Sequence, residues 1–110
     1  MEQYKIAVTR QAREHILEYA RYIRYDLMNA IASDAFIQRI YNEIGTLDQM
    51  PARYPLTDEE PWHTEGIHKM LVHGYIIYYD IDESQALVRI LAVVYGRQDQ
   101  AAALADIMNN

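Results

Sequence analysis

The spacing of hydrophobic residues near the N-terminus predicts a short strand followed by a helix. Residues 4–8 alternate and include β-branched side chains, which is typical of a strand. From Arg10 the period changes to three and four residues, which places the hydrophobic positions on one face of a helix. Thr9 lies at the expected N-cap and Asn29 at the expected C-cap. The repeating hydrophobic positions are Ala12, Ile16, Tyr19, Ala20, Ile23 and Leu27.

A second helix is predicted after a short joint at residues 28–33. Gly45 is expected to loosen its last turn, since glycine costs a helix about 1 kcal/mol relative to alanine, and Pro51 is expected to end it. Because the joint is short, the two helices should form an antiparallel hairpin. The hydrophobic stripe of the second helix consists of Phe36, Ile37, Ile40, Tyr41, Ile44 and Leu47.

The second half of the chain is rich in predicted strands. Residues 51–66 form an irregular, acidic connection that holds all three prolines and is long enough to be functional or mobile. Residues 67–73, 75–81 and 86–95 have the composition of strands. The last of these is apolar on both faces, which favours a central position in the sheet. Residues 99–108 are expected to form a short terminal helix.

This order of elements, β-α-α-β-β-β-α, predicts an α+β fold in a single domain spanning residues 1–110. A helical hairpin should pack on one face of a small, mostly antiparallel sheet, and the first strand should pair inside that sheet. No internal repeat and no low-complexity segment interrupts the chain.

The two faces of this sheet are expected to have different roles. Tyr75, Ile77 and Tyr79 should face the helical hairpin as core. The reverse face should leave an apolar surface that another protein covers, because monomers rarely tolerate a large exposed apolar patch. We expect that surface to contain Ile76, Tyr78, Leu91 and Val93.

Composition and charge narrow the classes of function. The 110 residues contain no cysteine, which excludes a disulfide framework, a thiolate zinc site and a cysteine nucleophile. The formal net charge is −6, and only residues 1–29 carry a net positive charge, of +1. Such a chain is not steered toward nucleic acid or an anionic membrane. No apolar run reaches the roughly 18 residues of a membrane span, and a cytoplasmic location is expected.

Three histidines raise the question of a metal site. His63, His68 and His73 are spaced by five residues, and an odd separation along a strand places the last two on opposite faces. They cannot share one ion without a bulge between them. We therefore expect neither a metal nor another cofactor.

Arg89, among apolar neighbours, is expected to be an edge residue with a buried stem or a paired charge.

Several motifs occur in a characteristic order. A leucine, a spacer and two prolines follow the second helix in residues 47–56. Residues 66–72 and 75–82 form a hairpin that reads Gly-Ile-His-Lys-Met-Leu-Val and then Tyr-Ile-Ile-Tyr-Tyr-Asp-Ile-Asp. Residues 90–99 close with Gly-Arg-Gln-Asp. Together with the order of elements, these motifs resemble the RelE/ParE superfamily of toxins from type II toxin–antitoxin systems.

The resemblance implies a small toxin that a cognate antitoxin holds inactive, with one of two targets. The RelE branch cuts messenger RNA on the ribosome without metal, and the ParE branch inhibits DNA gyrase. The RelE branch uses Lys, Arg and Tyr residues on the open face of the sheet. Here Lys69 and Arg97 match that cationic set, but His68 replaces an arginine of the hairpin motif and Ile76 replaces another.

Three functions therefore remain open. The incomplete cationic set and the acidic charge favour a ParE-like, gyrase-directed toxin. The first alternative is a ribosome-dependent messenger RNA endonuclease with Arg97, Lys69 and His68 as catalytic residues. The second is a non-toxic protein-binding module of the same fold. In each case we expect a hetero-oligomer with an antitoxin, and we expect Trp62, Tyr78 and Ile76 to be the partner-binding residues. For Trp62 a protein partner is favoured over a nucleic acid, because the acidic residues beside it repel phosphates.

Overall fold

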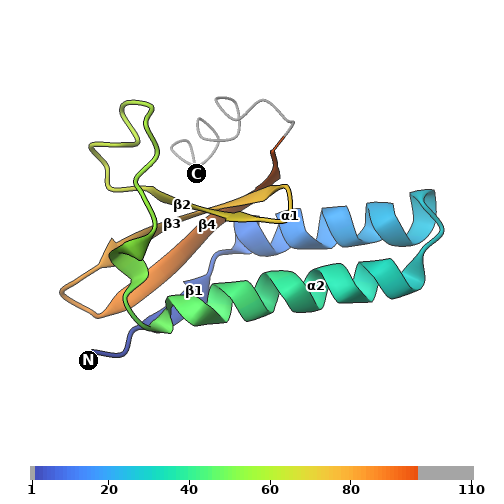
Figure 1. Cartoon of the computed structure of the whole chain (residues 1–110), viewed down its shortest axis with the longest axis horizontal. Helices are drawn as coiled ribbons and strands as arrows, with labels where there is room; N and C mark the ends of the chain where they lie inside the picture. Colours follow the sequence, from blue (N-terminus) through green and yellow to red (C-terminus); the bar gives the residue numbers. More distant parts are fainter. Residues whose placement is uncertain (1, 97–110) are drawn as a thin grey trace.

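A helical hairpin lies against one face of a four-stranded sheet (Figure 1). The computed structural model describes residues 2–96. The strands and helices are β1 (Lys5–Val8), α1 (Arg10–Arg21), α2 (Ala30–Gly45), β2 (His68–Val72), β3 (Tyr75–Asp82) and β4 (Leu87–Tyr95). Three short helical turns join them, namely the π-helical η1 (Tyr22–Asp26) and the 3-10 turns η2 (Thr46–Asp48) and η3 (Pro51–Arg53).

The strands are arranged in the order β1-β4-β3-β2. β3 pairs antiparallel with both β2 and β4, whereas β1 pairs parallel with β4. The parallel pairing is possible because the two helices return the chain across the sheet. The predicted α+β fold, its order of elements through β4 and the central position of β4 are confirmed. The terminal helix predicted at residues 99–108 lies outside the described residues.

The ends of the helices are set by side-chain caps. Thr9 is the N-cap of α1, as predicted, and its Oγ1 accepts a hydrogen bond from the amide of Ala12 at 3.2 Å. The prediction that Asn29 ends this helix is wrong. Met28 adopts the left-handed conformation instead, with φ of 53°. Asn29 then begins α2 as its N-cap, and its Oδ1 accepts from the amide of Ala32 at 2.9 Å.

The main core lies between the hairpin and the sheet. As predicted, Ile77 and Tyr79 are fully buried there, and Tyr75 packs at the edge of this core. The buried members of the cluster are Ala12, Ile16, Ala20, Phe36, Ile40, Ile44, Leu47, Met70, Val72, Ile77, Tyr79, Val88, Ile90 and Val93. The helical periodicity therefore identified most of the residues that face the sheet, whereas Leu27 and Tyr41 of the predicted stripes are exposed.

The reverse face of the sheet is covered, contrary to the prediction. Ile76 is only 5% exposed and Tyr78 only 1%, so the expectation that they form an open surface is wrong. The segment that connects η3 to β2 lies on this side of the sheet, opposite the helices (Figure 1). From it, Trp62 packs against a second buried cluster that consists of Ile67, Ile76, Tyr78, Ala92 and Val94. Alternation along β3 could not reveal that an irregular segment folds back over its outer face.

A β-bulge changes the faces of β4. The pairing register shifts between Tyr78 and Tyr79, and Leu91 is the extra residue on β4. Val93 is consequently 1% exposed within the main core, whereas Leu91 packs on the reverse face. The prediction that Val93 shares the face of Leu91 is wrong, because an extra residue inverts the alternation that follows it.

Within residues 2–96, no helix combines the length and the apolar character that a bilayer span requires.

Candidate functional site

The fold separates two of the residues predicted for RNA cleavage. His68 and Lys69 are neighbours in β2, so their side chains point to opposite faces. The His68 ring stacks on Tyr79 of the main core at 5.1 Å between centroids. Its Nδ1 lies 2.7 Å from the carbonyl oxygen of Tyr54, to which it donates a hydrogen bond. His68 is therefore held on the hairpin side of the sheet.

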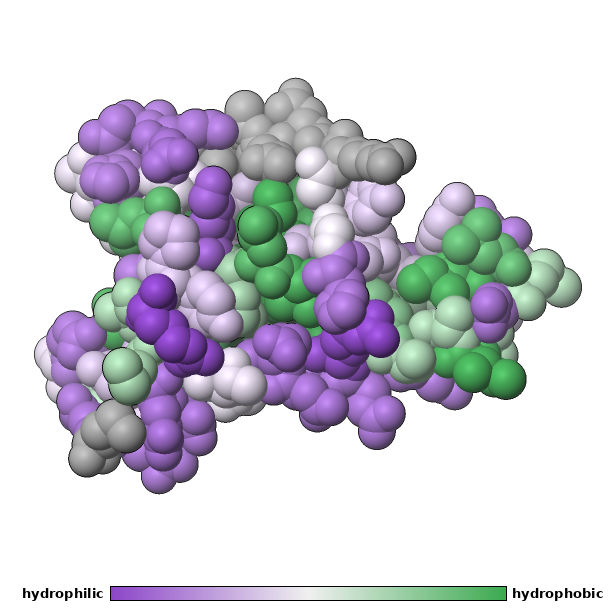
Figure 2. Space-filling view, viewed as in Figure 1, coloured by the Kyte–Doolittle hydropathy of each residue, from purple (hydrophilic) through white to green (hydrophobic). Residues whose placement is uncertain are grey.

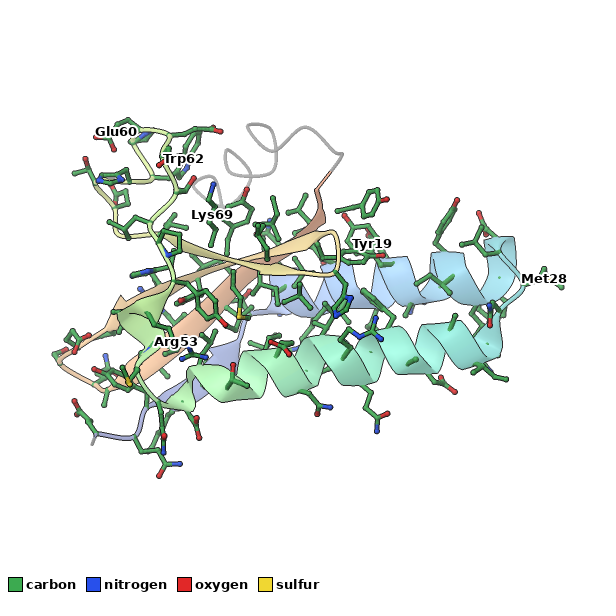
Figure 3. The ribbon with its side chains drawn as sticks, in the orientation of Figure 1. Tyr19, Met28, Arg53, Glu60, Trp62 and Lys69 are labelled. Atoms are coloured by element: carbon green, nitrogen blue, oxygen red, sulfur yellow. The ribbon has the colours of Figure 1, made fainter. Side chains whose placement is uncertain are left out.

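Lys69 lies on the other side of the sheet, where it pairs in register with Tyr78. Figure 3 shows Lys69 on the same side as Trp62. The third predicted catalytic residue, Arg97, lies outside the described residues. The structure therefore does not bring His68 and Lys69 to a common site.

Trp62 is carried by the acidic loop and serves first as a cover for the reverse face. It is partly buried against the cluster around Tyr78, and its indole Nε1 is buried without a hydrogen-bond acceptor among the described residues. The carboxylate of Glu60 accepts hydrogen bonds from the hydroxyl of Thr64 at 2.6 Å and from its amide at 2.8 Å. These bonds lower the pKa of Glu60 and stabilise the loop that presents Trp62. The role of Trp62 in binding a partner stays a prediction.

The other candidate groups are engaged locally. Nδ1 of His63 lies 3.0 Å from the carbonyl oxygen of Thr57, and His73 lies in the turn before β3. Among residues 2–96, no three histidine, aspartate or glutamate side chains are grouped as metal ligands would be. Arg89 forms two hydrogen bonds with the carboxylate of Asp80, at 2.9 and 2.8 Å. These bonds raise the pKa of the Arg89 guanidinium, and the interpretation as a paired charge is confirmed.

A concave surface lies between α1 and the sheet. It is a groove of about 630 Å³ where the C-terminal half of α1 passes the start of β3 and the end of β4. A volume of this size suits a ligand or an inserted side chain. We call it the tyrosine groove, and it is lined by Glu18, Tyr19, Tyr22, Ile23, Leu27, Tyr75 and Tyr95.

Aromatic contacts fix the inner wall of the tyrosine groove. The ring of Tyr75 stands at 71° to that of Tyr19 and at 62° to that of Tyr95, with centroids 5.2 and 5.3 Å apart. Phe36 supports Tyr75 from the core at 4.8 Å. The Tyr19 hydroxyl accepts a hydrogen bond from the amide of Tyr95 at 2.9 Å. Burial raises the pKa values of Tyr19 and Tyr75, so both phenols are protonated at neutral pH.

The groove continues onto an exposed apolar surface at the end of the hairpin. In η1 the amide of Leu27 bonds the carbonyl of Tyr22 at 3.1 Å, which is the wide i to i+5 turn of a π-helix. Figure 2 shows hydrophobic residues gathered at this end of the molecule. We call this surface the hairpin tip, and its side chains, between 52% and 84% exposed, are Tyr22, Tyr25, Leu27, Met28 and Ile31.

Sequence analysis missed both the tyrosine groove and the hairpin tip. The signal for the tip was the presence of Met28 and Ile31 in a helix–helix joint, where polar residues are usual. The groove had no such signal, because it forms only when Tyr19 is packed beside Tyr75 and Tyr95.

Comparison with protein families identifies the class of protein. A family model described as the ParE toxin of type II toxin–antitoxin systems (parDE) matches residues 6–100, which include both long helices, β2, β3, β4 and all of β1 except Lys5. The chain belongs to this ParE toxin family. It is thus a toxin-type member of the RelE/ParE superfamily, and the predicted superfamily is confirmed.

Solved structures share the fold of this ParE-family chain at low sequence identity. A chain of the chromosomal ParDE system from P. aeruginosa aligns with a TM-score of 0.70 and 13% identity, over 86% of this chain and 98% of that chain. The toxin–antitoxin complex RelBE2 from Mycobacterium tuberculosis gives 0.60 and 22%, over 86% and 93%. A free E. coli RelE mutant gives 0.53 and 11%, over 92% of each chain. No curated protein matches the sequence.

Proposed function

We propose that this chain is the growth-inhibiting toxin of a type II toxin–antitoxin pair, that it acts on DNA gyrase in the cytoplasm, and that direct binding of an antitoxin neutralises it. Its membership of the ParE family supports the toxin role. The observation that carries the choice of target is the position of His68 and Lys69 on opposite faces of β2. That arrangement argues against cleavage of messenger RNA.

Metal-free RNA cleavage sets a demanding geometry. A base must remove the proton of the 2′-hydroxyl, an acid must protonate the leaving oxygen, and a cation must stabilise charge on the same phosphate. In this chain the half-buried His68 ring stacks on Tyr79 of the main core, whereas Lys69 lies on the opposite face of the sheet. Ile76, which occupies a position where the RelE branch has an arginine, is buried. The net charge of −6 also opposes the approach of ribosomal RNA.

The exposed apolar surface supports an antitoxin partner. Side chains such as Met28 and Ile31 are 83% and 84% exposed, and monomeric proteins rarely leave so large an apolar patch uncovered. Two of the structurally similar chains come from toxin–antitoxin systems, ParDE and RelBE2. We therefore propose that the active toxin is released from a hetero-oligomer with its antitoxin, an arrangement that also suits plasmid stabilisation.

Induction of the chain in a host without the antitoxin tests this function. Growth should stop, and purified protein should inhibit supercoiling by purified gyrase. The variant Lys69→Ala should act as strongly as the wild type, because Lys69 has no part in this action. Co-expression with the product of an adjacent small reading frame should restore growth, and the two proteins should copurify.

Two results would contradict the proposal. Codon-phased cuts in messenger RNA, mapped by primer extension and lost in Lys69→Ala or Arg97→Ala, would establish the endonuclease alternative. Unimpaired growth together with normal supercoiling and intact messenger RNA would instead establish a non-toxic binding module of the same fold.

A further inference from the structure

We propose that the tyrosine groove binds an arginine or lysine side chain that a partner protein presents on an apolar segment. The identification of this partner as the antitoxin rests on the function proposed above. The chemistry of the groove does not, because it follows from the residues that line it.

Aromatic rings form most of the lining. Tyr75 contacts Tyr19 at 71° and Tyr95 at 62°, so the three rings that line the groove lie in different planes rather than forming one flat surface. Tyr22 adds a fourth ring from the side of α1, one helical turn after Glu18. The face of an aromatic ring carries negative electrostatic potential and attracts a cation that lies within about 6 Å of its centre.

The charge of the groove, like its ring faces, favours a cation. Among residues 2–96, Glu18 is the one charged residue that lines the groove, and its side chain is exposed on α1. Among the described residues no ion pair involves Glu18, since those formed join Arg24 to Asp34 and Arg89 to Asp80. A carboxylate beside four phenol rings, in a chain of net charge −6, attracts a cation and repels an anion.

The size and surroundings of the groove determine what must carry the cation. A space of about 630 Å³ is larger than a single arginine or lysine side chain requires, so neighbouring residues of the partner enter it as well. Ile23 and Leu27 add apolar side chains to the lining, and Leu27 also belongs to the exposed hairpin tip. The residues that flank the cation must therefore be apolar, as on one face of an amphipathic helix.

Selection from a library of random 12-residue peptides on the purified full chain tests this inference. Enriched peptides should carry arginine or lysine between apolar residues. By fluorescence anisotropy they should bind Glu18→Lys about tenfold more weakly than the wild type, a change expected from inverting one charge near the bound cation. Glu65→Lys makes the same change of charge on an exposed loop residue outside the groove, and it should bind the peptides like the wild type.

A second variant separates cation binding from simple apolar contact. Tyr95→Leu keeps apolar bulk at a side chain that is 37% exposed but removes a ring face. The amide of residue 95, which bonds Tyr19, is retained. Selection on Tyr95→Leu should yield apolar peptides with a weaker preference for arginine and lysine.

Four results would overturn the inference. They are enrichment of peptides without a cation, equal binding to the wild type and Glu18→Lys, no enrichment at all, and a dimer of the chain that Tyr95→Leu dissociates in sedimentation. None of them involves growth or supercoiling. A chain that stops growth but selects no cationic peptide would contradict only this inference, and a harmless chain that selects such peptides would contradict only the proposed function.

Discussion

Tyrosine combines apolar bulk with a polar group at several positions of this chain, and Tyr79 shows why that combination is used. Its side chain is fully buried in the main core, yet its hydroxyl donates a hydrogen bond of 2.6 Å to the carbonyl of Pro51. Pro51 begins the turn η3, so this bond ties the connection after α2 to the sheet. Burial raises the pKa of Tyr79, which keeps the donor protonated.

At the residue scale we predict that Tyr79→Phe destabilises the protein by about 1–2 kcal/mol, because the buried Pro51 carbonyl loses its donor while apolar packing is retained. Urea unfolding followed by circular dichroism measures this difference. Tyr25→Phe is the matched control and should have no effect, since the Tyr25 side chain is 65% exposed. Equal stability of Tyr79→Phe and the wild type would show that the bond contributes nothing.

At the scale of secondary-structure elements, the connections show where the chain departs from ideal geometry. The turn between β2 and β3 places His73 at φ 47° and Gly74 at φ 88°. Two successive residues with positive φ are the requirement of a type I′ hairpin turn. Glycine adopts that conformation freely, whereas histidine is strained in it.

We predict that His73→Asn stabilises the protein by about 0.5 kcal/mol, because Asn-Gly is the preferred sequence of such a turn. Gly74→Ala should instead destabilise it, since a side chain at φ 88° is strained even where space is available. Thermal unfolding of both variants measures the effects. A lower melting temperature for His73→Asn would count against this description of the turn.

The start of α2 gives a second prediction at this scale. Asn29→Ala removes the acceptor for the Ala32 amide and should cost about 1 kcal/mol in unfolding free energy. Asn29→Asp retains a cap oxygen and places a negative charge at the helix N-terminus, so its stability should equal or exceed that of the wild type. If both substitutions were equally destabilising, the role of Asn29 as an N-cap would be refuted.

At the scale of the whole molecule, each face of the sheet is covered by a different part of the chain. The helical hairpin covers one side, and the segment that carries Trp62 packs on the other. On the reverse face Leu71 is exposed, but the larger apolar surfaces among the described residues are the tyrosine groove and the hairpin tip. Covering both faces also keeps several phenols away from water.

These phenols give the stability of the fold a defined pH dependence. Burial raises the pKa values of Tyr19, Tyr75, Tyr78 and Tyr79 in the folded state. The unfolded chain then loses these protons first, so the contribution of these phenols to stability should be constant below about pH 10 and should be lost as the pH rises through the raised pKa values. Urea unfolding between about pH 8 and pH 11, together with phenolate absorbance, measures the change. Simultaneous titration of all ten tyrosines in the folded protein would contradict it.

The sequence alone determined the elements and their order, because hydrophobic periods of two and about 3.6 residues are local properties of strands and helices. It also identified the core face of the helices and the central position of β4. For the candidate site, the sequence motifs predicted the superfamily but not the tyrosine groove or the hairpin tip. Ile76 and Tyr78, which were predicted to bind a partner, are buried, and His68 and Lys69 lie on opposite faces.

Only the tertiary structure decided which surfaces remain open. The bulge at Leu91 inverts the faces of β4, and the segment around Trp62 returns to cover the reverse face. The tyrosine groove joins Tyr19 to Tyr95, which are 76 residues apart in the chain. Such contacts depend on how distant segments pack together, and a periodic pattern along one segment carries no information about which other segment will cover it.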